Sequence, residues 1–345
     1  MKEYFGIDYT RIFEKGAETC SQYDHSMGDS LKEYINIKIP EFIFDSKYKK
    51  IYVVGNYDRS QGISYKEKSD KMFNFKRPTF IINKDAIYVN CYPGIDYVFH
   101  YASLIKTALK LLEIEKEVIT CFPTPKEIIR EVKKSNISCI PKCKVAILGY
   151  VTGLNYLSND LNWNGNGDFL WKKIDTNKLL IGCKHSYWGD ISGYVVSALA
   201  KMGFEKVIYV GKLGTLNEEL IPNETIATGN KSMFLNGKII EWNNIFKSVN
   251  EEAIKEGIHF TLPSIIQENK QWVDKMNGKI NYVDPEIGHM ANSANINNIE
   301  FSYLHIISDN LSKKYAEDLS NERKNEIIIK RKKLLKIIGK SLIEL

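Results

Sequence analysis

A strand–helix–strand succession in the second half of the chain constrains the fold most. The run KVAILG at 144–149 and the run VIYVG at 207–211 are apolar, have strand length and end in glycine. Between them, apolar residues recur at helical spacing over 191–202, after a potential cap at Asp190 and before Gly203, a typical helix end. Because strands joined by a helix through short connections pair in parallel, the succession predicts an α/β fold.

Composition and charge restrict the class of protein. The chain has 345 residues, of which 43% are hydrophobic and 26% charged, as is typical of a globular protein of one large or two modest domains. Its net charge of +6 is small for a dedicated DNA-binding protein and suits an anionic small molecule equally well. We therefore expect a small-molecule ligand and no nucleic acid as partner.

The sequence also argues against secretion and against a metal site. No apolar run approaches the roughly 18 residues of a membrane span, and the first ten residues lack the apolar core of a signal peptide. Of the six cysteines only Cys139 and Cys143 lie close together, and no second Cys/His pair accompanies them. We expect a cytoplasmic protein with free thiols, no membrane partner, no metal and no cofactor.

The first part of the chain has secondary structure of its own. Strands are expected at 79–82 and 86–90, joined by an Asn-Lys-Asp turn. Apolar residues follow at helical spacing over 101–112, and a capping box with proline at 124–127 starts a second helix. These elements predict a small N-terminal α/β module.

Turn-forming residues and a proline at 135–143 mark a boundary, so we expect domains at 1–140 and 141–345. A weak internal echo crosses this boundary, since 86–120 and 179–210 both run strand, cysteine, glycine, helix, strand. Any α/β protein can show this order, and the echo alone does not predict a repeat.

Three groups of residues in the second domain can carry chemistry. The run GKLGT at 211–215 follows a buried strand, where glycines let backbone N–H groups approach a ligand oxygen. Glu286 stands at a helix entry and offers the acceptors that a pair of vicinal hydroxyls needs. Asp309 follows another buried strand and can protonate a leaving group there. Taken singly, these are equally well a tight turn, a helix N-terminal carboxylate and a helix cap.

Together, in order and spacing, the three groups resemble the nucleoside phosphorylase and nucleosidase superfamily, over about residues 144–345. This superfamily includes purine nucleoside phosphorylase-like, uridine phosphorylase-like and methylthioadenosine nucleosidase-like proteins. The stretches that carry the resemblance are, in chain order, KVAILG, KHSYWGDISG, VIYVGKLGTL, IATG, FTLPS, VDPE and IISDN.

The resemblance implies a three-layer α/β/α sandwich with a mixed, partly closed central sheet, extended at the N-terminus by the α/β module. It also implies a homo-oligomeric enzyme that cleaves the N-glycosidic bond of a nucleoside or nucleotide, with a purine base as first choice. By the family's motifs, Glu286 holds the ribose hydroxyls and Asp309 assists departure of the base, so both are expected to be catalytic. The substrate-binding residues that we expect are Phe260, Val283, Gly211, Lys212, Gly214 and His185.

The chain departs from the family pattern where phosphate would bind. Tyr209 replaces an arginine and Lys212 a serine or threonine, and the early phosphate motif is missing after Gly149. Pro285 replaces a methionine that lines the ribose pocket. We therefore expect water as the nucleophile. Two alternatives stay open: a phosphorylase that uses inorganic phosphate at an altered phosphate site, and a non-catalytic nucleotide sensor or regulatory module.

Several residues near these motifs have two interpretations. His185 and His289 lie near the presumed site, although a partly buried structural histidine is the more common case. Trp163 and Trp188 are placed to cover a base, although packing is more common for tryptophan. The basic stretch at 331–340 is expected on the solvated face of a docked amphipathic helix rather than in a nucleic-acid site.

Overall fold

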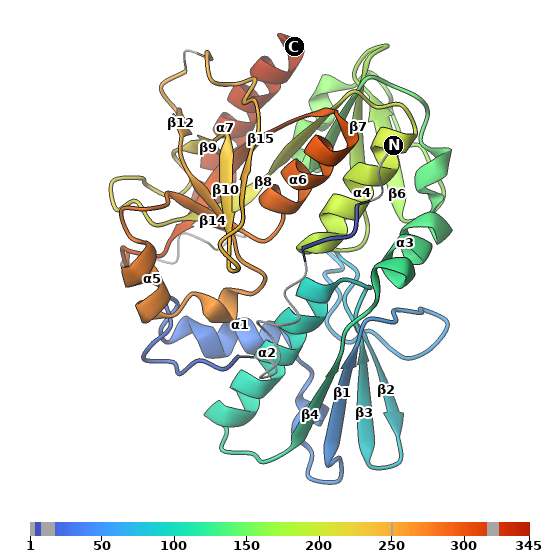
Figure 1. Ribbon diagram of the computed structural model, residues 1–345, viewed down its shortest axis with the longest axis vertical. Coiled ribbons are helices and arrows are strands. Elements are labelled where there is room, and N and C mark those ends of the chain that lie inside the picture. Colours follow the sequence, from blue (N-terminus) through green and yellow to red (C-terminus); the bar gives the residue numbers. More distant parts are fainter. Residues whose placement is uncertain (1–3, 8–17, 250, 316–323) are drawn as a thin grey trace.

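The computed structural model describes residues 4–7, 18–249, 251–315 and 324–345 and arranges them around two sheets (Figure 1). The smaller sheet has the order β2-β3-β1-β4, formed by β1 (Lys50–Val54), β2 (Thr79–Asn83), β3 (Ala86–Asn90) and β4 (Glu117–Cys121). The helices in this part of the chain are α1 (Ser30–Lys38), α2 (Ile95–Leu111), which packs on β1 and β4, and α3 (Pro125–Lys134), which packs against the larger sheet's α4 (Asp190–Lys201), with short 3-10 turns η1 (Glu41–Phe44) and η2 (Asn136–Cys139).

The larger sheet is mixed and runs in the order β11-β10-β13-β14-β8-β15-β9-β12, while β5 joins β8 to β7, and β7 pairs with β6. Its strands are β5 (Val145–Gly149), β6 (Phe169–Lys173), β7 (Lys178–Cys183), β8 (Lys206–Thr215), β9 (Ile226–Thr228), β10 (Lys231–Phe234), β11 (Ile239–Glu241), β12 (Ile254–Glu256), β13 (His259–Thr261), β14 (Tyr282–Asp284) and β15 (Glu300–Asn310). Its helices are α4 (Asp190–Lys201), α5 (Lys270–Met276), α6 (Ile287–Asn297) and α7 (Asn325–Ile343), with 3-10 turns η3 (Val151–Leu157) and η4 (Ile265–Gln267).

Alternating side chains of the larger sheet define three layers, as the sequence predicted. On β8, Val207 and Tyr209 belong to the apolar cluster that contains residues of α4 and α6, whereas Ile208 and Val210 belong to the cluster with α7 and η3. Because successive strand residues point to opposite faces, α4 and α6 cover one face and α7 the other. None of the helices in the described segments is long and apolar enough to cross a membrane.

Most locally encoded elements are where the sequence predicted them. β2 and β3 form the expected antiparallel hairpin, and Thr124 and Glu127 form the capping box of α3 through Thr124 N to Glu127 Oε2 at 2.7 Å. The predicted start of the last helix at Ser320 lies outside the described residues, and the helix is observed from Asn325. The predicted boundary near residue 140 falls between the two sheets, and the division into domains at 1–140 and 141–345 stays a prediction.

The two sheets share one topology. β2-β3-β1-β4 and β6-β7-β5-β8 have the same order, and in each the first pair is antiparallel while the next two pairs are parallel. α2 connects β3 to β4 as α4 connects β7 to β8. The echo between 86–120 and 179–210 therefore corresponds to a repeated structural unit, which the order of elements alone did not predict.

Gly149 makes the turn at the end of β5 possible. Its φ is +97°, and an added Cβ would overlap the carbonyl oxygen of Val210, which accepts the hydrogen bond from Tyr150 N at 2.7 Å. Gly203 after α4 has a similar φ of +95°, but an added Cβ there would meet nothing within 4 Å. Both positions need glycine for their backbone, and only Gly149 needs it for space.

We predict that Gly149→Ala destabilises the protein more than Gly203→Ala does. The left-handed backbone alone costs roughly 1–3 kcal/mol at either site, and the overlap with Val210 adds to this cost only at Gly149. The measurement is the free energy of unfolding of both variants in urea. Equal losses of unfolding free energy in the two variants would show that the backbones of β5 and β8 move apart to admit the added Cβ without loss of stability.

Candidate active site

Three adjacent strands bring predicted site residues together at the end of β8. Gly214 pairs with Val283 of β14 on one side and with Asp309 of β15 on the other. An added Cβ at Gly214 would lie 3.0 Å from Asp309 Oδ2, so glycine allows the carboxylate to approach the strand. The register of β15 shifts between Ile307 and Asp309, an irregularity of the kind that redirects a side chain beside a functional site.

Asp309 lies near a second carboxyl group. Asp309 itself is half-buried, and its Oδ1 accepts a hydrogen bond from Ser308 Oγ at 2.5 Å. Glu268, just after η4, is buried; this burial and the charge of Asp309 raise the pKa of Glu268 well above its usual range. Glu268 is thus a second carboxyl group within electrostatic reach of Asp309. No motif in the sequence indicated Glu268.

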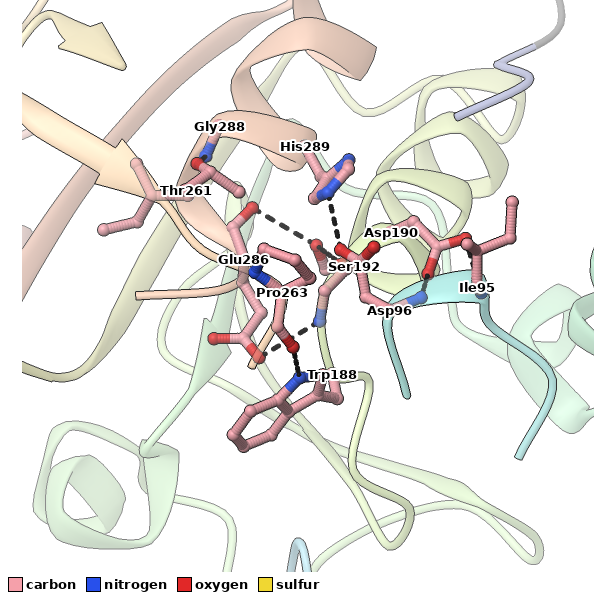
Figure 2. A network of polar contacts seen from close by, with 12 residues as sticks. Ile95, Asp96, Trp188, Asp190, Ser192, Thr261, Pro263, Glu286, Gly288 and His289 are labelled. Carbon is pink, nitrogen blue, oxygen red and sulfur yellow. Dashed lines mark hydrogen bonds and ion pairs between the residues drawn. The ribbon is translucent and has the colours of Figure 1, made fainter. Parts of the chain in front are cut away.

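Glu286 occupies the N-terminal end of α6 and faces the joint between β7 and α4 (Figure 2). Its Oε1 accepts a hydrogen bond from Gly189 N at 3.3 Å, and its Oε2 accepts one from Tyr209 Oη at 3.3 Å. The side chain keeps some accessible surface, yet burial of the carboxyl group and the charge of Asp284 raise its pKa well above the usual range. The carboxyl group is thus held in place by the protein and remains reachable.

Asp284 fixes the position of Glu286. Its Oδ1 accepts hydrogen bonds from Glu286 N and Ile287 N, both at 2.9 Å, and so caps α6. His259 Nε2 lies 3.1 Å from Oδ1 and His305 Nε2 lies 3.5 Å from Oδ2. Burial opposes ionisation of Asp284, but the two histidines outweigh it, and its pKa lies below the usual range. The sequence analysis did not identify this cluster.

A second buried network joins the N-terminal module to the larger sheet (Figure 2). The sequence suggested that Asp190 caps its own helix, but it accepts hydrogen bonds from Ile95 N at 3.1 Å and Asp96 N at 3.2 Å and so caps α2. His289 Nε2 lies 2.8 Å from Asp96 Oδ2, and its Nδ1 lies 2.8 Å from Tyr4 Oη. His289 is therefore a buried structural histidine at this junction.

The ring of Trp188 forms an aromatic wall, which is kept in place by contacts with both the N-terminal module and the later part of the chain. Its ring stacks on His100 of α2 with centroids 4.2 Å apart, and its Nε1 donates to Pro263 O at 2.7 Å. His100 Nδ1 in turn lies 3.0 Å from Ser264 Oγ. The residue after Trp188, Gly189, donates its N–H group to Glu286 Oε1 (Figure 2). The N-terminal module thus reaches the candidate site through α2.

The other predicted site residues lie in different surroundings. His185 is buried 3.1 Å from Asp168 and stacked on Tyr92, with ring centroids 4.3 Å apart. The buried ring of Phe260 packs edge-on against Trp272. An added Cβ at Gly211 would lie 2.5 Å from His305 Nε2. The Nζ of Lys212 is 5.9 Å from the centre of the Tyr150 ring. The substrate-binding roles of these residues stay predictions.

A separate hollow of about 910 Å³ lies at the amino ends of β1 and β4. Several lysines, among them Lys49, Lys106 and Lys116, line it together with apolar residues of α2 and β4. None of the predicted site residues lines this hollow, so we place the candidate site at the end of β8 on the grounds of its chemistry.

No model of a known protein family matches the chain. Among curated proteins, the oxidoreductase cns1 of the fungus Cordyceps militaris is 23% identical over 253 residues, which are 64% of this chain and 32% of that protein. The chain thus spans about a third of the length of this relative.

Solved structures with a similar course of the chain include nucleosidases and a hydrolase. The 5′-methylthioadenosine/S-adenosyl homocysteine nucleosidase of Campylobacter jejuni is 17% identical and covers 59% of this chain and 100% of its own, with a TM-score of 0.47. Futalosine hydrolase of Helicobacter pylori is 19% identical, over 59% of this chain and 98% of its own, with a TM-score of 0.46. They are members of the superfamily that the sequence motifs resemble.

We predict a pH-dependent contribution of the Asp190 junction to stability. Burial and the charge of Asp96 raise the pKa of Asp190 to about 7, against an ordinary value of 3.8. The folded state therefore holds a proton that the unfolded state has lost, and this stabilisation falls as the pH rises from about 4 to about 7. Relative to Asp190→Asn, the free energy of unfolding of the wild type should decline over this range.

The measurement is urea unfolding of both proteins at pH 5, 6, 7 and 8, with Asp274→Asn on the exposed face of α5 as a control. The control should leave the pH slope unchanged. A constant difference between wild type and Asp190→Asn at all four pH values would contradict the protonated state.

Proposed function

We propose that the protein hydrolyses the N-glycosidic bond of a nucleoside or nucleotide. The observation that carries the proposal is the placement of two carboxyl groups along β8, with Asp309 opposite Gly214 and Glu286 in contact with Tyr209. Glu286 follows β14 and Asp309 lies on β15, and these strands flank β8 on its two sides. A purine base, a cytoplasmic location and a homo-oligomeric assembly are parts of the same proposal.

Cleavage of a C–N glycosidic bond can use two carboxyl groups in different roles. Positive charge develops on the sugar and negative charge on the departing base, so an acid near the base and acceptors near the ribose stabilise the transition state. Asp309 takes the first role, supported by its half-buried position and by the neighbouring acid Glu268. Glu286 takes the second role, since its two oxygens already accept one N–H and one O–H group.

Water as the nucleophile is supported by the environment of Tyr209. This residue stands where phosphorylases of the resembled family have an arginine, and its hydroxyl donates to Glu286 Oε2 at 3.3 Å. A phenol that donates to a carboxyl group gives no positive charge to hold inorganic phosphate. Lys212 remains as a point charge on the same strand, half-buried, and can contact an anionic substituent.

The proposal predicts release of a free base without added phosphate. Purified protein is incubated with a panel of purine nucleosides and their monophosphates, with and without inorganic phosphate, and base and sugar products are separated. We expect the free sugar or its phosphate ester. Formation of ribose 1-phosphate in proportion to added phosphate would establish the phosphorylase instead, and absence of any free base would favour the non-catalytic sensor.

The same assay tests Asp309. Asp309→Asn removes the proton-transfer group while keeping its shape, and the rate of turnover should fall by about 10²–10⁴-fold. Asp274→Asn, exposed on α5, is the matched control and should retain wild-type turnover. Full activity of Asp309→Asn would remove Asp309 from the mechanism.

For Glu286, the prediction concerns the ribose hydroxyls. Glu286→Gln replaces one acceptor by a donor, and should lower kcat/KM for a ribonucleoside by an amount that corresponds to about 2–4 kcal/mol. With a 2′-deoxynucleoside the same substitution should cost much less, because one hydroxyl partner is already missing. Equal losses on both substrates would show that Glu286 does not bind the diol.

A further inference from the structure

Arg77 is a buried cation without an anionic partner. It lies just before β2, is 5% exposed, and donates from Nη1 to Asn74 Oδ1 at 3.2 Å and to Lys76 O at 3.0 Å. Both acceptors are uncharged. Within the described part of the chain, no carboxylate is within ion-pair distance of Arg77, and its Nε and Nη2 donate to no residue. Because a buried charge is normally paired, and because Nε and Nη2 keep some contact with solvent, these two donors are open to an anion.

The surroundings of Arg77 connect it to the candidate active site. Its charge acts on the hydroxyl groups of Tyr97 and Tyr101, where it opposes the rise in pKa that burial causes. The ring of Tyr97 lies 5.1 Å from that of Tyr101 and 6.4 Å from that of Trp188. Trp188 adjoins Gly189, whose N–H holds Glu286. Tyr97, Trp188 and Glu286 thus follow one another in space, and the charge of Arg77 acts on the first of them.

A second set of interactions leads from Arg77 to Asp309. Tyr34 of α1 is half-buried, and its hydroxyl is acted on by the charges of Glu268, Arg77 and Asp309. Burial raises the pKa of Glu268 and lowers that of His100. Glu268 and Asp309 from one part of the chain and Arg77 from the other thus act with opposite signs on the Tyr34 hydroxyl group.

We propose that Arg77 binds an anionic group of the substrate, and that the preferred substrate is a nucleoside monophosphate. This inference rests on the function proposed above. The planar guanidinium presents Nε and Nη2 as a fork that matches two oxygens of a phosphate, and the hydroxyl groups of Tyr34 and Tyr97 are further donors. The N-terminal module, which supplies all three side chains, acts as the part of the molecule that selects the substrate.

Binding rather than turnover tests the proposal. Protein carrying Asp309→Asn, in which turnover is expected to be too slow to deplete the ligand, is titrated calorimetrically with adenosine, inosine and guanosine and with their 2′-, 3′- and 5′-monophosphates. We expect one monophosphate to bind about 10- to 100-fold more tightly than its nucleoside, the effect of charge-assisted hydrogen bonds in a closed site. A nucleoside 5′-carboxylic acid shows whether the site requires a phosphate or accepts any anion.

Variants then assign the effect to Arg77. Arg77→Met should remove the preference for the monophosphate and leave the affinity for the nucleoside unchanged, while Arg77→Lys should keep part of the preference. Arg130→Met, at an exposed position of α3, is the matched control and should keep all of it. Lys212→Ala tests a cation on β8. Thermal unfolding of each variant checks that it is folded.

The results separate this inference from the proposed function. Equal affinity for nucleosides and monophosphates in the protein with Arg77 intact would overturn the anion site and leave the glycosidase proposal standing. A preference that survives Arg77→Met, or that Lys212→Ala alone removes, would also overturn it. If neither nucleosides nor monophosphates bind, both proposals fail.

Discussion

The carboxylate of Asp284 is the interaction on which the candidate site depends. It lies at the end of β14, between the imidazoles of His259 and His305, and it accepts the first backbone N–H groups of α6. One buried charge therefore links β13, β14 and β15 to the helix that carries Glu286. The histidines favour the ionised form of this buried carboxyl group, which defines where α6 begins. The position of Glu286, at the start of α6, is defined with it.

The part of this arrangement that sequence predicts is the part encoded locally. Apolar runs ending in glycine and the capping box at Thr124 define β5, β8 and α3, and the VDPE and SDN stretches indicate Glu286 and Asp309. The structure confirms the three-layer fold and places both carboxyl groups beside β8. Their roles, and those of Phe260 and His185, stay predictions, since residue type and order alone do not define what a side chain contacts.

What the sequence could not predict depends on residues far apart in the chain. Asp190 was expected to cap its own helix, yet it caps α2, nearly a hundred residues earlier, because α2 and α4 present their N-terminal ends to each other. Glu268 carries no motif, and its raised pKa arises only from burial beside Asp309. Likewise Arg77 looks like an ordinary surface residue in a charged loop until its 5% exposure is known. Long-range packing creates each of these features.

The pairing of β15 with β8 has a consequence for the order in which the molecule can assemble. Within each of the groups β1 to β4 and β5 to β8, strands pair with partners at most 67 residues away along the chain, whereas β15 pairs along its length with a strand nearly a hundred residues earlier. Local pairings form quickly and distant ones late, because the intervening loop must first be closed. Asp309 lies on that late strand. A partly folded chain can therefore possess most of its framework and still lack the strand that carries Asp309.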